Sequence, residues 1–212
     1  MMKDARKEFW ESEKIIAEFS EKKPSFYITK VLDNLIKNRK IKKALDIGCG
    51  AGRYSSYLAK KGLDVIAIDR HEKLVTPILC KKNIIFFKSE MEKLPVQTSE
   101  FDLILSVGVL HNATSLMELE RSIQEMARVL KRRGIVVCSI FTNDIISNDL
   151  VKMNEEYMFL VNGQLPMLLI SKRDIKIILE KNKLTNIQTI DEHITNVGSG
   201  DRYVYTFLCE KE

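Results

Sequence analysis

Residues 44–53 of the 212-residue chain read Ala-Leu-Asp-Ile-Gly-Cys-Gly-Ala-Gly-Arg. An apolar run that carries one acid, Asp46, leads into glycines at alternate positions 48, 50 and 52. A short apolar run is typical of a strand buried on both faces. Glycines after it let the chain turn sharply and let a ligand approach the backbone. Residues 53–60 then predict a helix, whose free N–H groups would face that ligand. The stretch therefore predicts a strand, a ligand-binding turn and a helix.

The glycine spacing separates this turn from the dinucleotide-binding fingerprint. That fingerprint would place its third glycine at position 53, where this chain has Arg53, and Gly52 precedes it. A nicotinamide oxidoreductase is therefore the least favoured of the enzyme classes considered.

Further short apolar runs follow, and helical segments alternate with them. The runs cover residues 64–68, 84–87, 103–105 and 135–140, several of them rich in β-branched residues. Residues 115–130 give the clearest helical pattern, with apolar residues three or four positions apart. Alternating strands and helices predict right-handed crossovers and a parallel sheet with helices on both faces.

The C-terminal part breaks this alternation. A capped helix is predicted to begin at Ser171, with Asp174 three residues on. Two strands follow near 184–194 and 203–209, and too few residues, including Gly198 and Ser199, separate them for a parallel crossover. The predicted fold is thus α/β, a doubly wound, mostly parallel seven-stranded sheet with an antiparallel last strand.

Acidic residues stand at the ends of the first three predicted strands. Asp69 closes the second strand and Glu90 the third, as Asp46 does near the end of the first. The carboxyl ends of parallel strands meet in the crevice where open α/β sheets bind ligands. Each acid alone could be a helix cap or a surface residue. Together they predict an acid-lined crevice suited to a cationic ligand.

These motifs resemble the class I S-adenosylmethionine-dependent methyltransferases, and most closely the small UbiE-like, or type 11, group. The resemblance covers about residues 40–141 and rests on residues 45–52, 69, 90–95, 101–111 and 130–134. It implies a Rossmann-like fold whose seventh strand runs against the others, which agrees with the predicted final hairpin. It also implies S-adenosylmethionine as cofactor and S-adenosylhomocysteine as product.

The resemblance also assigns cofactor-binding residues by position. Asp46 and the loop residues Gly48, Cys49, Gly50 and Gly52 would hold the methionine end. Asp69 would bind the ribose hydroxyls, and the adenine would lie near Arg70, Glu90 and Met91, while Ser106 and Val107 would line the sulfonium region. The chain departs from the family pattern in two places. Ser89-Glu90 replaces the common Gly-Asp, and residues 131–134, Lys-Arg-Arg-Gly, replace a Lys-Pro-Gly-Gly turn.

The catalytic and substrate residues are less defined. A sulfonium methyl group is already activated, so a general base is needed only where the acceptor arrives protonated. His111 is the candidate base, and a packing or capping role is the alternative. Trp10, Tyr27 and Tyr157 are candidates for the acceptor site, with core packing as the alternative. No spacing of ligand residues suggests a metal.

A single domain is expected from the length. It divides into an N-terminal helical cap (1–40), a cofactor-binding core (41–141), a lid (142–170), and a C-terminal helix with an antiparallel hairpin (171–212). No apolar stretch approaches the ~18 residues that span a bilayer, and residues 1–8 do not resemble a signal peptide. Four scattered cysteines, at 49, 80, 138 and 209, fit a reducing cytoplasm.

Thirty-four basic and 29 acidic side chains leave a net charge of +5, carried partly in short basic runs. These are read as solvated surface, so nucleic acid is not expected as a partner. The favoured function is methyl transfer to a small molecule. The alternatives are methylation of RNA or protein, and a regulator that binds the cofactor without catalysis. The oligomeric state and the acceptor are left open.

Overall fold

The computed structural model describes residues 8–75, 82–162, 165–197 and 200–212. Cys80, the turn residues Gly198 and Ser199, and most of the charged N-terminal stretch, all used in the predictions above, lie outside the described residues.

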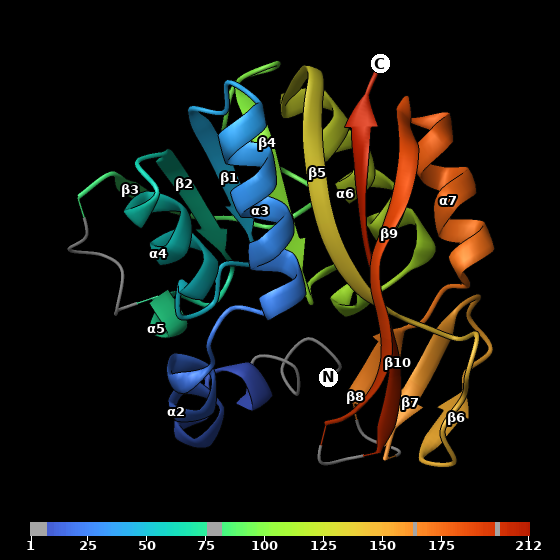
Figure 1. Cartoon of the computed structure of the whole chain (residues 1–212). Coiled ribbons are helices and arrows are strands. Elements are labelled where there is room, and N and C mark those ends of the chain that lie inside the picture. The colour runs from blue at the N-terminus through green and yellow to red at the C-terminus, as the bar shows by residue number, and fades with distance from the viewer. Residues whose placement is uncertain (1–7, 76–81, 163–164, 198–199) are drawn as a thin grey trace.

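The core is a seven-stranded sheet with the strand order β3-β2-β1-β4-β5-β10-β9 (Figure 1). Its parallel strands are β1 (Lys43–Ile47), β2 (Asp64–Asp69), β3 (Ile84–Lys88), β4 (Phe101–Val107) and β5 (Leu130–Thr142). The last strand, β10 (Asp201–Lys211), pairs antiparallel with both β5 and β9 (Leu184–Asn196). The predicted mostly parallel sheet with an antiparallel last strand is confirmed.

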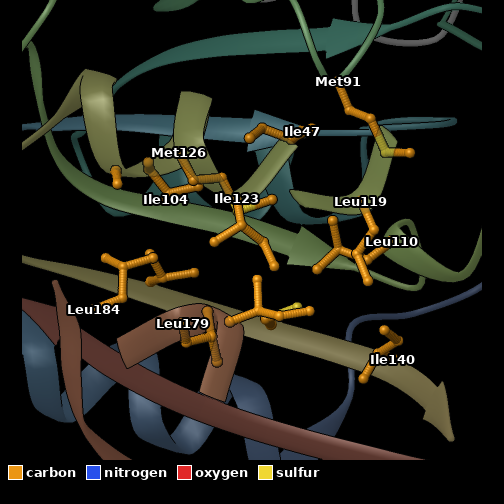
Figure 2. Close-up of a cluster of buried hydrophobic side chains, with 14 of the residues drawn as sticks. Ile47, Met91, Ile104, Leu110, Leu119, Ile123, Met126, Ile140, Leu179 and Leu184 are labelled. Carbon is orange, nitrogen blue, oxygen red and sulfur yellow. The ribbon is translucent and has the colours of Figure 1, made fainter. Parts of the chain in front are cut away.

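Helices pack on both faces of this sheet, as the alternating pattern predicts. On one face, α3 (Phe26–Asn38) and α4 (Arg53–Lys60) bury Leu32 and Leu58 against alternate residues of β1, β2 and β4. On the other face, α6 (Leu116–Val129) and α7 (Lys172–Lys181) form the larger apolar cluster. Figure 2 shows part of it, with Ile123 and Met126 beside Ile104 and with Leu179 beside Leu184.

The helix starts follow the capping signals of the sequence. The Ser115 hydroxyl accepts the N–H of Glu118 at the start of α6, and the Ser171 hydroxyl accepts the N–H of Asp174 at the start of α7. These hydroxyls satisfy N–H groups that have no partner within the helix. Further helical elements are α2 (Glu13–Glu21), α5 (Glu72–Val75) and the 3-10 turn η2 (Leu110–Asn112), and α2 lies against α5.

The segment expected as a lid contains a second, three-stranded antiparallel sheet that the sequence analysis did not predict. Its strands are β6 (Leu150–Lys152), β7 (Met158–Val161) and β8 (Leu165–Leu168). Phe159 and Met167 pack in an apolar cluster that Phe141 joins from the end of β5. The two guanidinium Nη atoms of buried Arg202 donate to both oxygens of Asp149, at 3.0 and 2.6 Å, and tie this segment to β10.

The three cysteines that the structure describes, Cys49, Cys138 and Cys209, are buried free thiols. Within the described ranges, none of the helices has the length and apolar character needed to cross a membrane.

Candidate cofactor and acceptor site

A cavity opens at the carboxyl edge of the parallel strands, at the lower edge of the sheet in Figure 1. Asp46 and Ile47 at the end of β1, Asp69 at the end of β2 and Val107 at the end of β4 all line it. These strands are parallel neighbours, so residues far apart in the sequence meet at one edge. The structure thus brings two of the three predicted acids into one cavity.

Asp46 is buried on the cavity wall, with 2% of its surface exposed. The hydroxyl of Ser55, one turn into α4, donates to its carboxylate at 2.5 Å. Burial raises the pKa of Asp46 to about 6, against the lowering effect of the Ser55 hydrogen bond. At pH 7 and above this carboxyl group is therefore mainly an anion with little solvent around it.

Asp69 is also buried, and its carboxylate holds the glycine turn in place. One oxygen accepts the N–H of Gly50 at 2.9 Å and the other accepts the N–H of His71 at 2.8 Å. Burial raises the pKa of Asp69, while these two hydrogen bonds act against the rise. A carboxylate offers about four lone-pair sites, so each oxygen keeps acceptor capacity for a ligand.

The glycine turn has left-handed backbone at the predicted positions. The φ angles of Gly48, Gly50 and Gly52 are +65°, +52° and +76°. A Cβ at Gly48 would lie 2.4 Å from Cγ2 of Val109, so only glycine fits between β1 and the turn after β4. A Cβ at Gly50 would meet no atom within 4 Å. The backbone at Gly50 is thus open to a ligand, whereas Gly52 is buried at the start of α4 and does not line the cavity.

The N-terminal region supplies an aromatic wall. Trp10 and Phe19 line the cavity, and their rings pack edge to face with centroids 5.4 Å apart. A carboxylate oxygen of Glu11 lies 3.5 Å from Nδ1 of His71, which connects this wall to the end of β2. Trp10 was a predicted acceptor-site residue, whereas Phe19 was not predicted as a site residue.

Of the residues predicted to lie near the adenine, some line the cavity and one does not. Met91 and Arg70 line the cavity, together with Ser89, but Glu90 does not. The Glu90 side chain is about half exposed, and an oxygen of its carboxylate lies 2.6 Å from Nη2 of Arg70. The expectation of three convergent acids therefore differs from the structure at Glu90, whose half-exposed side chain pairs with Arg70 and does not line the cavity.

Two residues, one within β4 and one just after it, also differ from their expected surroundings. His111 is 3% exposed and does not line the cavity, and its ring stacks on Phe141 with centroids 4.0 Å apart. The packing role that was its alternative describes this placement. Ser106 is fully buried within β4 behind the wall, which its neighbour Val107 lines. Asn112, from η2, lines the cavity and was not predicted.

Two predicted acceptor-site aromatics lie elsewhere. Tyr27 is 55% exposed on α3, with Phe26 beside it, and does not line the cavity. The Tyr157 hydroxyl donates to Asp174 at 3.0 Å, which ties the small sheet to the start of α7. Burial and the hydrogen bond to Asp174 raise the pKa of Tyr157 to about 12.

Comparison with known proteins gives one family match. Residues 45–138 match the family model described as a methyltransferase domain. The chain is 27% identical over 141 residues to a ubiquinone biosynthesis O-methyltransferase of Pelagibacter ubique, which covers 60% of this chain and 58% of that protein. It is 29% identical over 90 residues to a tRNA (carboxymethyluridine(34)-5-O)-methyltransferase of Xenopus tropicalis, over 42% of this chain and 14% of that protein.

Solved structures confirm the fold. The 1,6-didemethyltoxoflavin-N1-methyltransferase of Burkholderia thailandensis, solved with bound 1,6-didemethyltoxoflavin and S-adenosylhomocysteine, matches with a TM-score of 0.66 and 18% identity over all of this chain and 84% of that one. The chain spans about half the length of curated relatives it matches, between 42% and 58% for four of them. The family-model match, residues 45–138, covers the parallel strands and the residues that line the cavity, other than Trp10 and Phe19.

Proposed function

We propose that this chain is a class I S-adenosylmethionine-dependent methyltransferase that transfers a methyl group to a small-molecule acceptor. The match of residues 45–138 to the methyltransferase family model supports the proposal. The observation that carries the proposal is the pair of buried carboxylates, Asp46 and Asp69, on the wall of one cavity beside an open glycine backbone.

The donor set of the cavity fits this cofactor. S-adenosylmethionine carries a positive sulfonium, an ammonium group and a ribose with two hydroxyls. The buried anion of Asp46 and the backbone of Gly50 would hold its methionine end. The free acceptor capacity of Asp69 suits the ribose hydroxyls, and Ser89 and Met91 would border the adenine.

When bound, the cofactor supplies a methyl group already activated by the positive charge on sulfur. The residues of this chain then have to bind, orient and exclude water. Alignment of two reactants can lower a barrier by ~7–11 kcal/mol at best. Trp10 and Phe19 cover the cavity with apolar surface, and aromatic faces also attract a sulfonium. His111, buried against Phe141, contributes here through packing, and any role as a base is a separate proposal.

A small acceptor is favoured over RNA by the charges around the cavity. Its wall carries two arginines, Arg53 and Arg70, against the carboxylates of Asp46 and Asp69. An RNA substrate needs a run of cations that tracks its phosphates. The tRNA methyltransferase among the relatives keeps methylation of RNA as the second candidate, and steep salt dependence of RNA binding would favour it. A regulator would bind the cofactor and transfer no methyl to any acceptor.

Calorimetric titration with S-adenosylhomocysteine tests the cofactor site. We expect binding by the wild-type chain and at least tenfold weaker binding by Asp69→Ala, because charge-assisted hydrogen bonds to the ribose are worth ~1.5–3 kcal/mol. Asp64→Ala is the matched control, since Asp64 lies exposed at the other end of β2. No heat and no thermal shift with wild type would refute the proposal. An unchanged affinity of Asp69→Ala would remove Asp69 from the ribose role.

A screen of small acceptors with S-adenosylmethionine labelled on the methyl group tests the reaction itself. Labelled product with a small molecule, independent of RNA or protein, is the expected result. Binding of S-adenosylhomocysteine without methyl transfer to any small acceptor would favour methylation of RNA or protein, or a regulator that binds the cofactor without catalysis.

A further inference from the structure

A second groove lies at the opposite edge of the sheet, where the parallel strands begin. Arg39 and Lys40 from the end of α3, Lys131, Arg132 and Arg133 from the start of β5, and Asp102 from β4 line it. It lies toward the upper edge of the sheet in Figure 1, where β10 ends. The five residues of β1 separate the two edges by roughly 16 Å. The groove is therefore distinct from the proposed methyl-transfer cavity.

The cations of the groove exceed the carboxylates that could neutralise them. Asp102 is paired with Lys131 at 2.7 Å, and its other oxygen accepts backbone N–H groups. Glu210 pairs with Arg39 at 2.9 Å. Lys40 and Arg132 are exposed and have no carboxylate partner in the described part of the chain. The groove thus holds cationic side chains that internal ion pairs do not use.

Arg133 adds a conformational argument. Its φ is +61°, in the left-handed region where a residue with a Cβ is strained and glycine is not. Its side chain is 81% exposed and reaches a carboxylate oxygen of Glu210 only at 3.7 Å. An arginine with this backbone conformation costs stability, and an exposed ion pair as long as the one to Glu210 offsets little of that cost. The side chain is therefore available for an external anion, and the turn brings it beside Arg132.

We propose that this groove binds a small phosphate-bearing anion, at a site separate from methyl transfer. Guanidinium groups donate to phosphate oxygens in pairs, and an ammonium group adds a point charge. Arg132, Arg133 and Lys40 offer this combination around one concavity. The neighbouring carboxylates of Asp102 and Glu210 limit the positive surface to a compact area, which suits an oligophosphate or a phosphorylated metabolite better than an extended strand of RNA.

Calorimetric titration with inorganic tripolyphosphate at low ionic strength tests this proposal. We expect saturable binding by the full chain, and affinity about fivefold to tenfold lower in Arg132→Gln and in Arg133→Gly. Arg121→Gln, an equal loss of charge at an exposed position of α6, is the matched control and should bind like wild type. Arg133→Gly should bind more weakly while its thermal midpoint stays the same or rises, a combination that a structural role would not give.

Three results would overturn the proposal. One is no binding of tripolyphosphate; another is an equal loss of affinity in Arg121→Gln and Arg132→Gln, which would indicate general charge attraction. The third is binding of a single-stranded RNA oligonucleotide without binding of tripolyphosphate. Titration of the same variants with S-adenosylhomocysteine keeps this test independent of the proposed function, because affinity for that ligand should not change.

Discussion

Asp46 gives a pH-dependent prediction that connects stability to the site. Burial raises its pKa to about 6 from an ordinary value of 3.8. The folded protein therefore holds this proton more tightly than the unfolded chain. The stabilisation from protonation is fully present below pH 3.8 and is lost as the pH rises through 6. One pKa unit corresponds to ~1.36 kcal/mol, so the ionised, buried carboxyl costs about 3 kcal/mol at pH 8.

The substitution Asp46→Asn removes this cost and keeps an oxygen that can accept the Ser55 hydroxyl. From the two pKa values, the unfolding free energy of Asp46→Asn relative to wild type should rise by about 1.5 kcal/mol between pH 5 and pH 8. Urea unfolding of both proteins at several pH values measures the difference. A difference that does not change with pH would refute the argument that Asp46 is a buried anion.

The Asp46→Asn variant also tests whether the negative charge of Asp46, which costs stability, contributes to ligand binding. Asp46→Asn should bind S-adenosylhomocysteine at least tenfold more weakly at pH 8, because a charge-assisted contact to the ammonium group of the ligand is lost. Greater stability together with weaker binding is the expected pair of results. Weaker binding accompanied by a loss of stability would instead indicate that the substitution damages the cavity wall.

Two further comparisons test the walls of the site. Gly48→Ala should lower the unfolding free energy by about 2–4 kcal/mol, because it adds left-handed strain and a clash with Val109. Gly50→Ala adds the strain alone and should lower it by about 1–2 kcal/mol. Urea unfolding measures both losses, and equal losses would contradict the contact with Val109. Trp10→Ala should weaken binding of S-adenosylhomocysteine or of the acceptor severalfold in calorimetry, because Trp10 lines the cavity. Tyr27 is an exposed aromatic outside the cavity, so Tyr27→Ala should leave both affinities unchanged. A larger loss of affinity in Tyr27→Ala than in Trp10→Ala would mean that the acceptor binds along α3.

The large sheet could be predicted because each strand is a short apolar run between recognisable helices. Residues 53–60 were expected as a helix and form α4 with the same bounds. The short link before residue 201 excluded a parallel crossover, and β9 and β10 are antiparallel. The small sheet was missed because β7 and β8 have only four residues each, and Pro166 interrupts the strand pattern of β8. The fold decides which of these short strands pair with each other, and the periodicity of the sequence does not indicate that pairing.

The acids of the site could be predicted because parallel strands bring their carboxyl ends together. Asp46 and Asp69 follow that rule, but Glu90 lies in the loop after β3, where its half-exposed carboxylate pairs with Arg70. Phe19 could not be identified from the sequence, because its approach depends on how α2 packs against α5. The sequence therefore predicted site residues at strand ends, but it did not predict those that reach the cavity through packing between separate elements.

Three positions at which this chain departs from ordinary folding preferences, Asp46, Gly48 and Arg133, lie at opposite edges of the large sheet. At the carboxyl edge, Asp46 is an acid buried in the wall of a cavity, and Gly48 occupies backbone that no other residue fits. At the amino edge, Arg133 takes a conformation suited to glycine and leaves its side chain exposed. Departures without local compensation are expected at functional positions, since folding alone would favour their replacement. If Asp46→Asn and Arg133→Gly both stabilise the fold while each weakens a different ligand, the two edges are separate binding sites on one sheet.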